Sequence, residues 1–261
     1  MKGFLIDIDG VLKVGERPVE GASDFIDYLN RKGFPFVLVT NNSTRTPEEV
    51  SDRLQRMGLK VTPEHILTSA LATALYLEHN FGRGHKVYVI GENGLRSALE
   101  DIGWEILPDH RGAEFVVIGL DRKCTYEKIR EAIRAILMEN ARFVASNSDR
   151  TMPSEDGPMP GAGAIVRAVE YATGVTPVVI GKPNPFIGRI AIEKLGSPTP
   201  DELYVIGDRP ETDVALARNI GARAVLVLSG VTSPDALNDL PENLKPDIVV
   251  KSVRGLLESL E

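Results

Sequence analysis

Cysteine and long apolar runs are scarce in this 261-residue chain. Cys124 is its single cysteine, so no disulfide can form within the chain, and a reducing compartment is expected. The first apolar stretch, Phe4 to Ile6, stops at Asp7, which excludes a signal-peptide core, and no other run has the length of a membrane span. These absences predict a cytoplasmic protein that has no membrane partner.

An excess of basic residues is missing too. The 30 Lys and Arg residues are outnumbered by 37 Asp and Glu residues, which gives a net charge of -7. This balance argues against nucleic acid as a partner, because proteins that bind the phosphate backbone normally present a basic surface. Apolar residues make up 43% of the chain and charged residues 26%, so an ordinary folded core is expected.

Short apolar runs alternate with amphipathic stretches along the whole chain. This alternation is typical of βα units that build a mainly parallel sheet, so the predicted fold class is α/β. The expected strands cover residues 4–8, 36–39, 87–90, 115–118, 142–145, 177–180, 203–206, 224–228 and 248–250. The expected helices cover residues 21–31, 47–57, 69–80, 93–101, 126–139, 161–173, 185–195 and 210–219.

The first predicted strand runs into the sequence Asp7-Ile8-Asp9-Gly10. In extended backbone the two carboxylates, at i and i+2, point to the same side. Ligands of open α/β sheets bind outside the carboxyl ends of the strands, so these acids lie where a site is expected. The alternative is that the acids only form a turn after the strand.

Polar groups also follow the second predicted strand, where Thr40, Asn41 and Asn42 stand in sequence. Their hydroxyl, amides and free backbone N–H groups suit the oxygens of a phosphate. The same residues are compatible with an ordinary Asx turn.

Two later strand ends complete the set. Lys182 follows strand 177–180 and supplies a cation, although most lysines simply face solvent. Asp208 and Asp213 follow strand 203–206, where a helix N-cap is the alternative for either aspartate. An acid pair, a hydroxyl with amides, a lysine and a second acid pair are together the inventory that phosphoryl transfer needs.

In this order, the four groups resemble the motifs of the haloacid dehalogenase superfamily, whose phosphatases use Asp-x-Asp, Ser/Thr, Lys and Gly-Asp-x(3,4)-Asp. The resemblance implies a Rossmann-like parallel-sheet core and an Mg²⁺-dependent phosphatase. Such an enzyme hydrolyses small-molecule phosphate monoesters through a phospho-aspartate, here on Asp7. The dehalogenases of the superfamily lack the acid that stands here as Asp9, and they need no metal.

The spacing of the motifs also predicts an inserted domain. The segment between Asp9 and the first helix is too short to hold one, whereas the chain between Thr40 and Lys182 is longer than the core requires. We therefore expect a discontinuous core of residues 1–83 and 177–261 and a smaller inserted α/β cap of residues 84–176. The insertion resembles the type-two cap of the NagD-like and 4-nitrophenyl phosphatase group.

The resemblance assigns roles to the matching acids and to the lysine. Asp7 is the expected nucleophile, and Asp9 the general acid for the leaving alcohol and then the base that activates water. Asp7, Asp208 and the main-chain carbonyl of Asp9 are the expected Mg²⁺ ligands, since hard oxygen ligands suit magnesium. Lys182 would hold the transferring phosphoryl group, and Asp213 would orient Lys182 or metal-bound water.

The remaining expectations concern binding. Thr40, Asn41 and Asn42 are expected to contact the phosphate. Asn147 and Asp149, in a loop of the predicted cap, are expected to contact the substrate and to select it, with an ordinary surface turn as the alternative. The expected partner is a small phosphorylated molecule, and the resemblance is compatible with a homodimer.

Two other functions share parts of this site. A phosphomutase or phosphotransferase would use the same intermediate on Asp7. A non-enzymatic response-regulator receiver also combines acids, a hydroxyl and a lysine, but it carries the phosphorylated acid on a later strand. The histidines, among them His110, show no metal-ligand spacing and are expected to pack or to face solvent.

Overall fold

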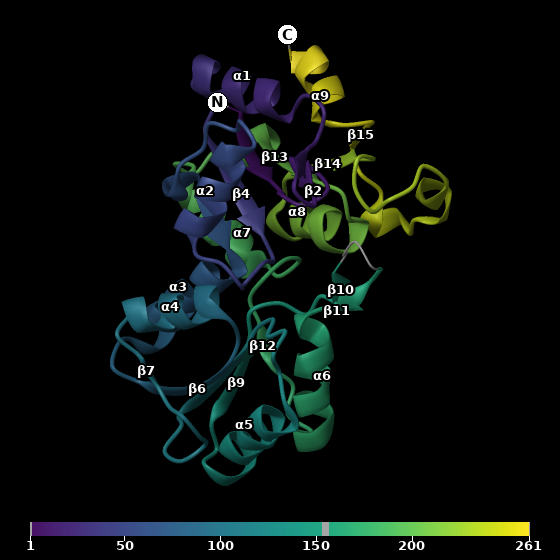
Figure 1. Cartoon of the computed structure of the whole chain (residues 1–261). Coiled ribbons are helices and arrows are strands. Elements are labelled where there is room, and N and C mark those ends of the chain that lie inside the picture. The colour runs from purple at the N-terminus through teal and green to yellow at the C-terminus, as the bar shows by residue number, and fades with distance from the viewer. Residues whose placement is uncertain (1, 153–156, 261) are drawn as a thin grey trace. The chain divides into compact units, whose positions relative to one another are not determined.

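The structure is a computed structural model that describes residues 2–152 and 157–260. The chain divides into two units (Figure 1). The first unit comprises Met1–Thr40, Glu48–Leu67 and Lys182–Glu261, and the second comprises Asn41–Pro47 and Thr68–Gly181. Both units are built on sheets of parallel strands, which confirms the predicted α/β fold class.

The first unit contains a six-stranded sheet in the order β15-β14-β13-β1-β4-β5. The central strand β1 pairs in parallel with β4 and β13, and all of its residues are buried, as expected for a strand covered on both faces. The strands are β1 (Gly3–Ile6), β4 (Phe36–Thr40), β5 (Ile66–Thr68), β13 (Leu203–Gly207), β14 (Arg223–Val227) and β15 (Ile248–Val250).

The order of these strands reverses beside β1. The chain moves from β1 to β4 and β5 on one side, and from β13 to β14 and β15 on the other. Such a reversal opens a crevice outside the carboxyl ends of the strands, where open α/β sheets bind their ligands. Asp7 follows β1 and Asp208 follows β13, so the sheet places both aspartates at this point.

Helices and one hairpin complete the first unit. α1 buries Phe25, Ile26 and Leu29 on one face, and it packs beside α9. The helices are α1 (Ala22–Lys32), α2 (Pro47–Arg56), α7 (Pro185–Lys194), α8 (Ala215–Ile220) and α9 (Val253–Leu260), and the hairpin joins β2 (Lys13–Val14) to β3 (Arg17–Pro18).

The second unit contains a five-stranded sheet in the order β12-β9-β8-β6-β7. Its strands are β6 (Lys86–Ile90), β7 (Glu105–Ile106), β8 (Phe115–Ile118), β9 (Arg142–Ala145) and β12 (Val178–Val179), with a separate hairpin of β10 (Thr151–Met152) and β11 (Met159–Pro160). Its helices are α3 (Ser69–Phe81), α4 (Asn93–Asp101), α5 (Tyr126–Met138) and α6 (Ala162–Thr173). α5 and α6 pack on each other and enclose an apolar core with β6, β8 and β9.

The second unit is larger than the predicted cap of residues 84–176. It takes in α3 because this helix packs on α4, and it reaches Gly181 because β12 pairs with β9. It also includes Asn41–Pro47. The boundaries of the inserted domain stay a prediction. Within the described parts of the chain, no helix has the length and apolar character that crossing a membrane requires.

Candidate active site

Lys182 lies between two aspartates in the first unit. Its Nζ is 2.8 Å from Oδ1 of Asp7 and 2.7 Å from Oδ1 of Asp213. The backbone N–H of Asp7 donates to the carbonyl of Ile206 on the neighbouring strand β13, which fixes the start of the loop after β1. Lys182 and Asp213 are buried, so the predicted lysine does not face solvent.

The carboxylate of Asp208 lies against two glycines, Gly10 and Gly230, and a larger residue at either position would overlap with it. Its Oδ2 accepts the backbone N–H of Val231 at 2.7 Å, and it is buried. A Cβ added at Gly10 or at Gly230 would lie 2.2 or 2.0 Å from this same oxygen. Gly10 also has a φ of +85°, which favours glycine on backbone grounds. Oδ1 of Asp208 is buried and has no hydrogen-bond partner among the described residues.

Asp7, Asp208 and Asp213 form the three-acid group, in which one carboxylate oxygen of each lies within 4.8 Å of the others. Burial raises the pKa of Asp7 well above its usual value, Lys182 opposes this shift, and the other two carboxylates add to it. Burial and the charge of Asp213 raise the pKa of Asp208 to about 6. Burial lowers the pKa of Lys182, but Asp213 and Asp7 outweigh burial and the net shift is upward.

The charges of the three-acid group favour a further cation. The group has three carboxylates, and the ammonium of Lys182 contacts only those of Asp7 and Asp213. Oδ1 of Asp208, which has no hydrogen-bond partner among the described residues, is a buried acceptor of the kind that a metal satisfies. Oxygen ligands without histidine or cysteine suit Mg²⁺ better than Zn²⁺, and within the described chain the group contains neither. Asp7 and Asp208, two of the three predicted ligands, therefore fit a magnesium site, and the main-chain carbonyl of Asp9 stays a predicted ligand.

The segment after Asp208 departs from the predicted helix 210–219. Pro210–Val214 forms a π-helical turn, and α8 begins only at Ala215. The wide turn brings Asp213 back, so that its Oδ2 accepts the backbone N–H of Arg209 at 3.0 Å while its Oδ1 faces Lys182. Such turns are frequent at functional sites.

Asp9 does not belong to the three-acid group. Its side chain is half exposed, and its carboxylate forms an ion pair with the ammonium of Lys13, whose side chain is almost fully buried. The backbone N–H groups of Leu12 and Lys13 both donate to the carbonyl of Ile8, and this tight turn brings Lys13 to Asp9. The sequence reasoning missed Lys13, because the spacing of four residues suggests contact only within a helix.

The residues after β4 divide between the two units. Thr40 is buried at the carboxyl end of β4, in the first unit. Asn41 and Asn42 belong to the second unit. Oδ1 of Asn42 accepts both the backbone N–H and the hydroxyl of Thr44 at 2.8 Å, so Asn42 forms the Asx turn that was the alternative to phosphate binding. Phosphate binding by Asn42 remains a prediction.

Asn147 and Asp149 both contact Asn41. Nδ2 of Asn41 donates to Oδ1 of Asp149 at 2.9 Å, and Nδ2 of Asn147 donates to the carbonyl of Asn41 at 2.8 Å. Asn147 is buried and also accepts the backbone N–H of Asp149 at 3.1 Å. Asn147 therefore forms an Asx turn with Asp149, as in the turn alternative, although Asn147 is buried rather than exposed. Contact of the two residues with substrate remains a prediction.

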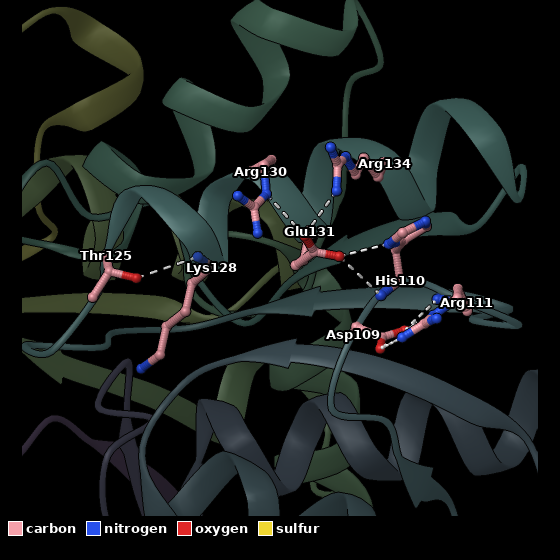
Figure 2. A network of polar contacts seen from close by, with 8 residues as sticks. All are labelled: Asp109, His110, Arg111, Thr125, Lys128, Arg130, Glu131 and Arg134. Atoms are coloured by element: carbon pink, nitrogen blue, oxygen red, sulfur yellow. Dashed lines mark hydrogen bonds and ion pairs between the residues drawn. The ribbon is translucent and has the colours of Figure 1, made fainter.

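A second cluster of charged side chains lies in the second unit. Figure 2 shows Arg130 and Arg134 of α5, together with His110, directed at Glu131. His110, whose Nδ1 is 2.5 Å from Oε2 of Glu131, is the largest cause that lowers the pKa of this carboxyl. Glu131 accepts hydrogen bonds from His110, Arg130 and Arg134, so we interpret this cluster as structural. This agrees with a histidine that has no metal-ligand spacing.

Comparisons with known proteins agree with this geometry. The model of the haloacid dehalogenase-like hydrolase family matches residues 4–105, and a second model of HAD-like hydrolases matches residues 179–256. The chain is 41% identical to the acid sugar phosphatase of Staphylococcus aureus (strain USA300), across 100% of this chain and 98% of the relative. The chain belongs to the haloacid dehalogenase-like hydrolase family.

Solved structures of the family place the chain among its phosphatases. The p-nitrophenyl phosphatase from Archaeoglobus fulgidus is 38% identical with a TM-score of 0.92, and the match covers 99% of this chain and 98% of that one. The glycerol phosphate phosphatase from Mycobacterium tuberculosis, solved in complex with magnesium, is 31% identical with a TM-score of 0.90, and the match covers 98% of this chain and 76% of that one. The prediction of an HAD-type phosphatase of the NagD-like group is confirmed.

Proposed function

We propose that this HAD-family phosphatase hydrolyses small-molecule phosphate monoesters with Mg²⁺, through a phospho-aspartate on Asp7. The observation that carries the proposal is the arrangement of Asp7, Lys182 and Asp208. A carboxylate at the end of the central strand has an ammonium 2.8 Å away and a buried neighbouring carboxylate with a partnerless oxygen. The residues proposed as nucleophile, fixed cation and metal ligand therefore lie close together, which supports the proposal.

Charge neutralisation is the first requirement of this reaction, because a phosphate dianion repels an approaching carboxylate. Asp7, Asp208 and the main-chain carbonyl of Asp9 would hold Mg²⁺, which supplies positive charge to the phosphoryl oxygens when bound. Lys182 adds a second positive charge, and Asp213 holds its ammonium in place at 2.7 Å. This contact supports the orienting role of Asp213. Thr40 and Asn41 remain the predicted phosphate contacts.

The proposed reaction has two steps. An oxygen of Asp7 attacks phosphorus, the bond to the leaving oxygen breaks, and Asp9 gives its proton to the departing alcohol. Asp9 then takes a proton from water, whose oxygen attacks phosphorus and releases phosphate from Asp7. Asp9 must leave Lys13 for this work, and its half-exposed side chain is compatible with such a rotation.

The substrate class follows from the relatives. Their names specify sugar, p-nitrophenyl and glycerol phosphates, which share a phosphate ester of a small alcohol. A phosphomutase or phosphotransferase would pass the phosphoryl group from Asp7 to another hydroxyl instead of water. A receiver would form a stable phosphoenzyme without turnover. A cytoplasmic location and a homodimer remain predictions of the sequence.

The testing experiment is a phosphate-release screen over sugar, glycerol, nucleoside and p-nitrophenyl phosphates, in Mg²⁺ and then in excess EDTA. We expect release from several substrates in Mg²⁺ alone, and none from an Asp7→Asn variant with an unchanged circular dichroism spectrum. Undiminished turnover in EDTA would contradict the metal assignment. Transfer to an added sugar in preference to water would identify a phosphotransferase.

A further inference from the structure

Two of the points where the chain passes between the units adjoin residues of the proposed site. The first segment of the first unit ends at Thr40 and its last segment begins at Lys182, whereas the neighbouring residues Asn41 and Gly181 belong to the second unit. Thr40 and Lys182 are the residues expected to hold the phosphoryl group. The conformation of Asn41, which follows Thr40, and of Gly181, which precedes Lys182, is thus set by contacts within the second unit.

Those contacts converge on Asn41. Its carbonyl accepts Nδ2 of Asn147 at 2.8 Å and the hydroxyl of Ser69 at 2.7 Å, while its own Nδ2 donates to Asp149 at 2.9 Å. Asp149 is itself fixed, because its backbone N–H donates to Asn147 and its carbonyl accepts the backbone N–H of Gly163. Both the backbone and the side chain of Asn41 are therefore held.

Gly181 completes this arrangement. Its backbone N–H donates to the carbonyl of Ser146 at 2.8 Å. A Cβ at Gly181 would lie 2.6 Å from Oδ1 of Asn41 and 2.6 Å from the Ser146 carbonyl, and 3.1 Å from Cβ of Asn147. The glycine is required by this close approach, since its φ lies outside the left-handed region. The side-chain amide of Asn41 is thereby confined between Asp149 and Gly181.

We infer that Asp149 is a positioning residue that acts through Asn41, rather than a residue that reads the leaving group of the substrate. The carboxylate accepts one N–H of the Asn41 amide and so fixes which way that amide faces. Asn41 directly follows Thr40 and is itself a predicted phosphate contact, so the orientation of its amide would decide which polar group it offers to the phosphate. The inference rests on the proposed phosphatase function, and it reassigns a residue that the sequence pattern placed against the substrate.

A double-mutant cycle tests the inference. We expect Asp149→Ala to lower kcat/KM about tenfold, the equivalent of roughly 1.4 kcal/mol and the size expected for one lost hydrogen bond. The loss should fall on kcat and be equal for p-nitrophenyl, sugar and glycerol phosphates. Asp149→Asn keeps an oxygen acceptor for the Asn41 amide and should restore most of the rate. Asp109→Ala, which removes another paired aspartate of the same unit, is the matched control.

The decisive arm is the Asn41→Ala background. If Asp149 acts through Asn41, Asp149→Ala should cause no further loss there. A loss of undiminished size in this background, or a loss that differs severalfold between leaving groups, would overturn the inference and restore a direct substrate contact. A wild-type chain without turnover would instead overturn the proposed function.

A second pair of variants, at Gly181 and Gly255, tests the position of the Asn41 amide independently of Asp149. Gly181→Ala should also lower kcat, because the new methyl group meets Oδ1 of Asn41 and the carbonyl of Ser146 at the same short distance of 2.6 Å and so shifts the Asn41 amide. Gly255→Ala, where the nearest atom to a new Cβ is 3.6 Å away, should leave kcat unchanged. The side-chain amide NMR signal of Asn41 should move in Gly181→Ala and Asp149→Ala and stay in place in Asp149→Asn. An unmoved signal in Asp149→Ala would contradict the proposed positioning independently of turnover.

Discussion

The Asp208→Asn variant distinguishes two effects of Asp208: its negative charge destabilises the three-acid group without a metal, and its carboxylate is a proposed ligand when Mg²⁺ is bound. The substitution keeps the shape of the side chain, and the amide oxygen can still accept the backbone N–H of Val231. The amide nitrogen then takes the place of Oδ1, for which the described residues offer no hydrogen-bond partner. The variant loses one buried negative charge and one proposed metal ligand, so its stability should change in opposite directions without and with Mg²⁺.

The magnitude follows from the pKa of Asp208. Moving this pKa from 3.8 to about 6 corresponds to about 3 kcal/mol between the two protonation states. Because the folded-state pKa is the higher one, this contribution stabilises the metal-free wild type below pH ~4 and is lost as the pH rises through about 6. The Asp208→Asn side chain does not ionise, so the variant does not lose this stability as the pH rises. We subtract about 1 kcal/mol for the rearranged hydrogen bond of the amide. The unfolding free energy of the variant should then exceed that of the wild type by roughly 2 kcal/mol at pH 7.5 in EDTA.

The assay is urea denaturation of both proteins at pH 4.5 and pH 7.5, in EDTA and in Mg²⁺. The advantage of Asp208→Asn in EDTA should shrink at pH 4.5. Mg²⁺ at a hundredfold its Kd should stabilise the wild type by about 2.7 kcal/mol and the variant by much less. Equal stabilisation of both proteins by Mg²⁺ would refute the assignment of Asp208 as a ligand. A variant less stable than the wild type at pH 7.5 in EDTA would refute the electrostatic reasoning.

The other variants probe single contacts of the same site. Asp9→Asn should slow turnover by roughly 10²- to 10⁴-fold, measured as steady-state phosphate release, if its carboxyl is the general acid and base. Lys182→Met leaves the buried Asp213 and the largely buried Asp7 without their counter-charge and should cost about 3 to 5 kcal/mol of unfolding free energy at pH 7.5 in EDTA; a loss under 1 kcal/mol would contradict this. Gly10→Ala places a methyl group against Asp208 and should weaken the Mg²⁺ stabilisation more than Gly15→Ala, since both glycines have positive φ but a new Cβ at Gly15 meets nothing within 4 Å.

The sequence predicted those parts of the site that depend on strand ends. Parallel pairing of β1 with β13 brings Asp7 and Asp208 to one edge of the sheet, and an apolar run followed by acids is enough to predict this. Most helices and strands were predicted within about two residues, since their apolar periodicity is strong. The exceptions among the helices are α8, which begins at Ala215 rather than at residue 210, and α9 (Val253–Leu260), which was not predicted. Strand β5 (Ile66–Thr68) was missed, because a three-residue strand has too few positions to show a period.

Other features depend on contacts that no local pattern encodes. The π-helical turn at Pro210–Val214 accompanies the contacts of Asp213 with Lys182 and with the backbone N–H of Arg209, whereas its sequence looks like an ordinary helix start. The ion pair of Asp9 with Lys13 requires the tight turn that begins at Ile8 and ends at Lys13.

The most direct test of the proposed mechanism is chemical trapping of the intermediate. The wild-type chain would be mixed with substrate and Mg²⁺, quenched in acid during turnover, reduced with borohydride and digested for peptide mass spectrometry. Borohydride converts an aspartyl phosphate to homoserine, so we expect that product at position 7, and only when both substrate and Mg²⁺ were present. Homoserine at another aspartate, or continued turnover with no trapped residue in any peptide, would contradict the central claim that Asp7 is the nucleophile.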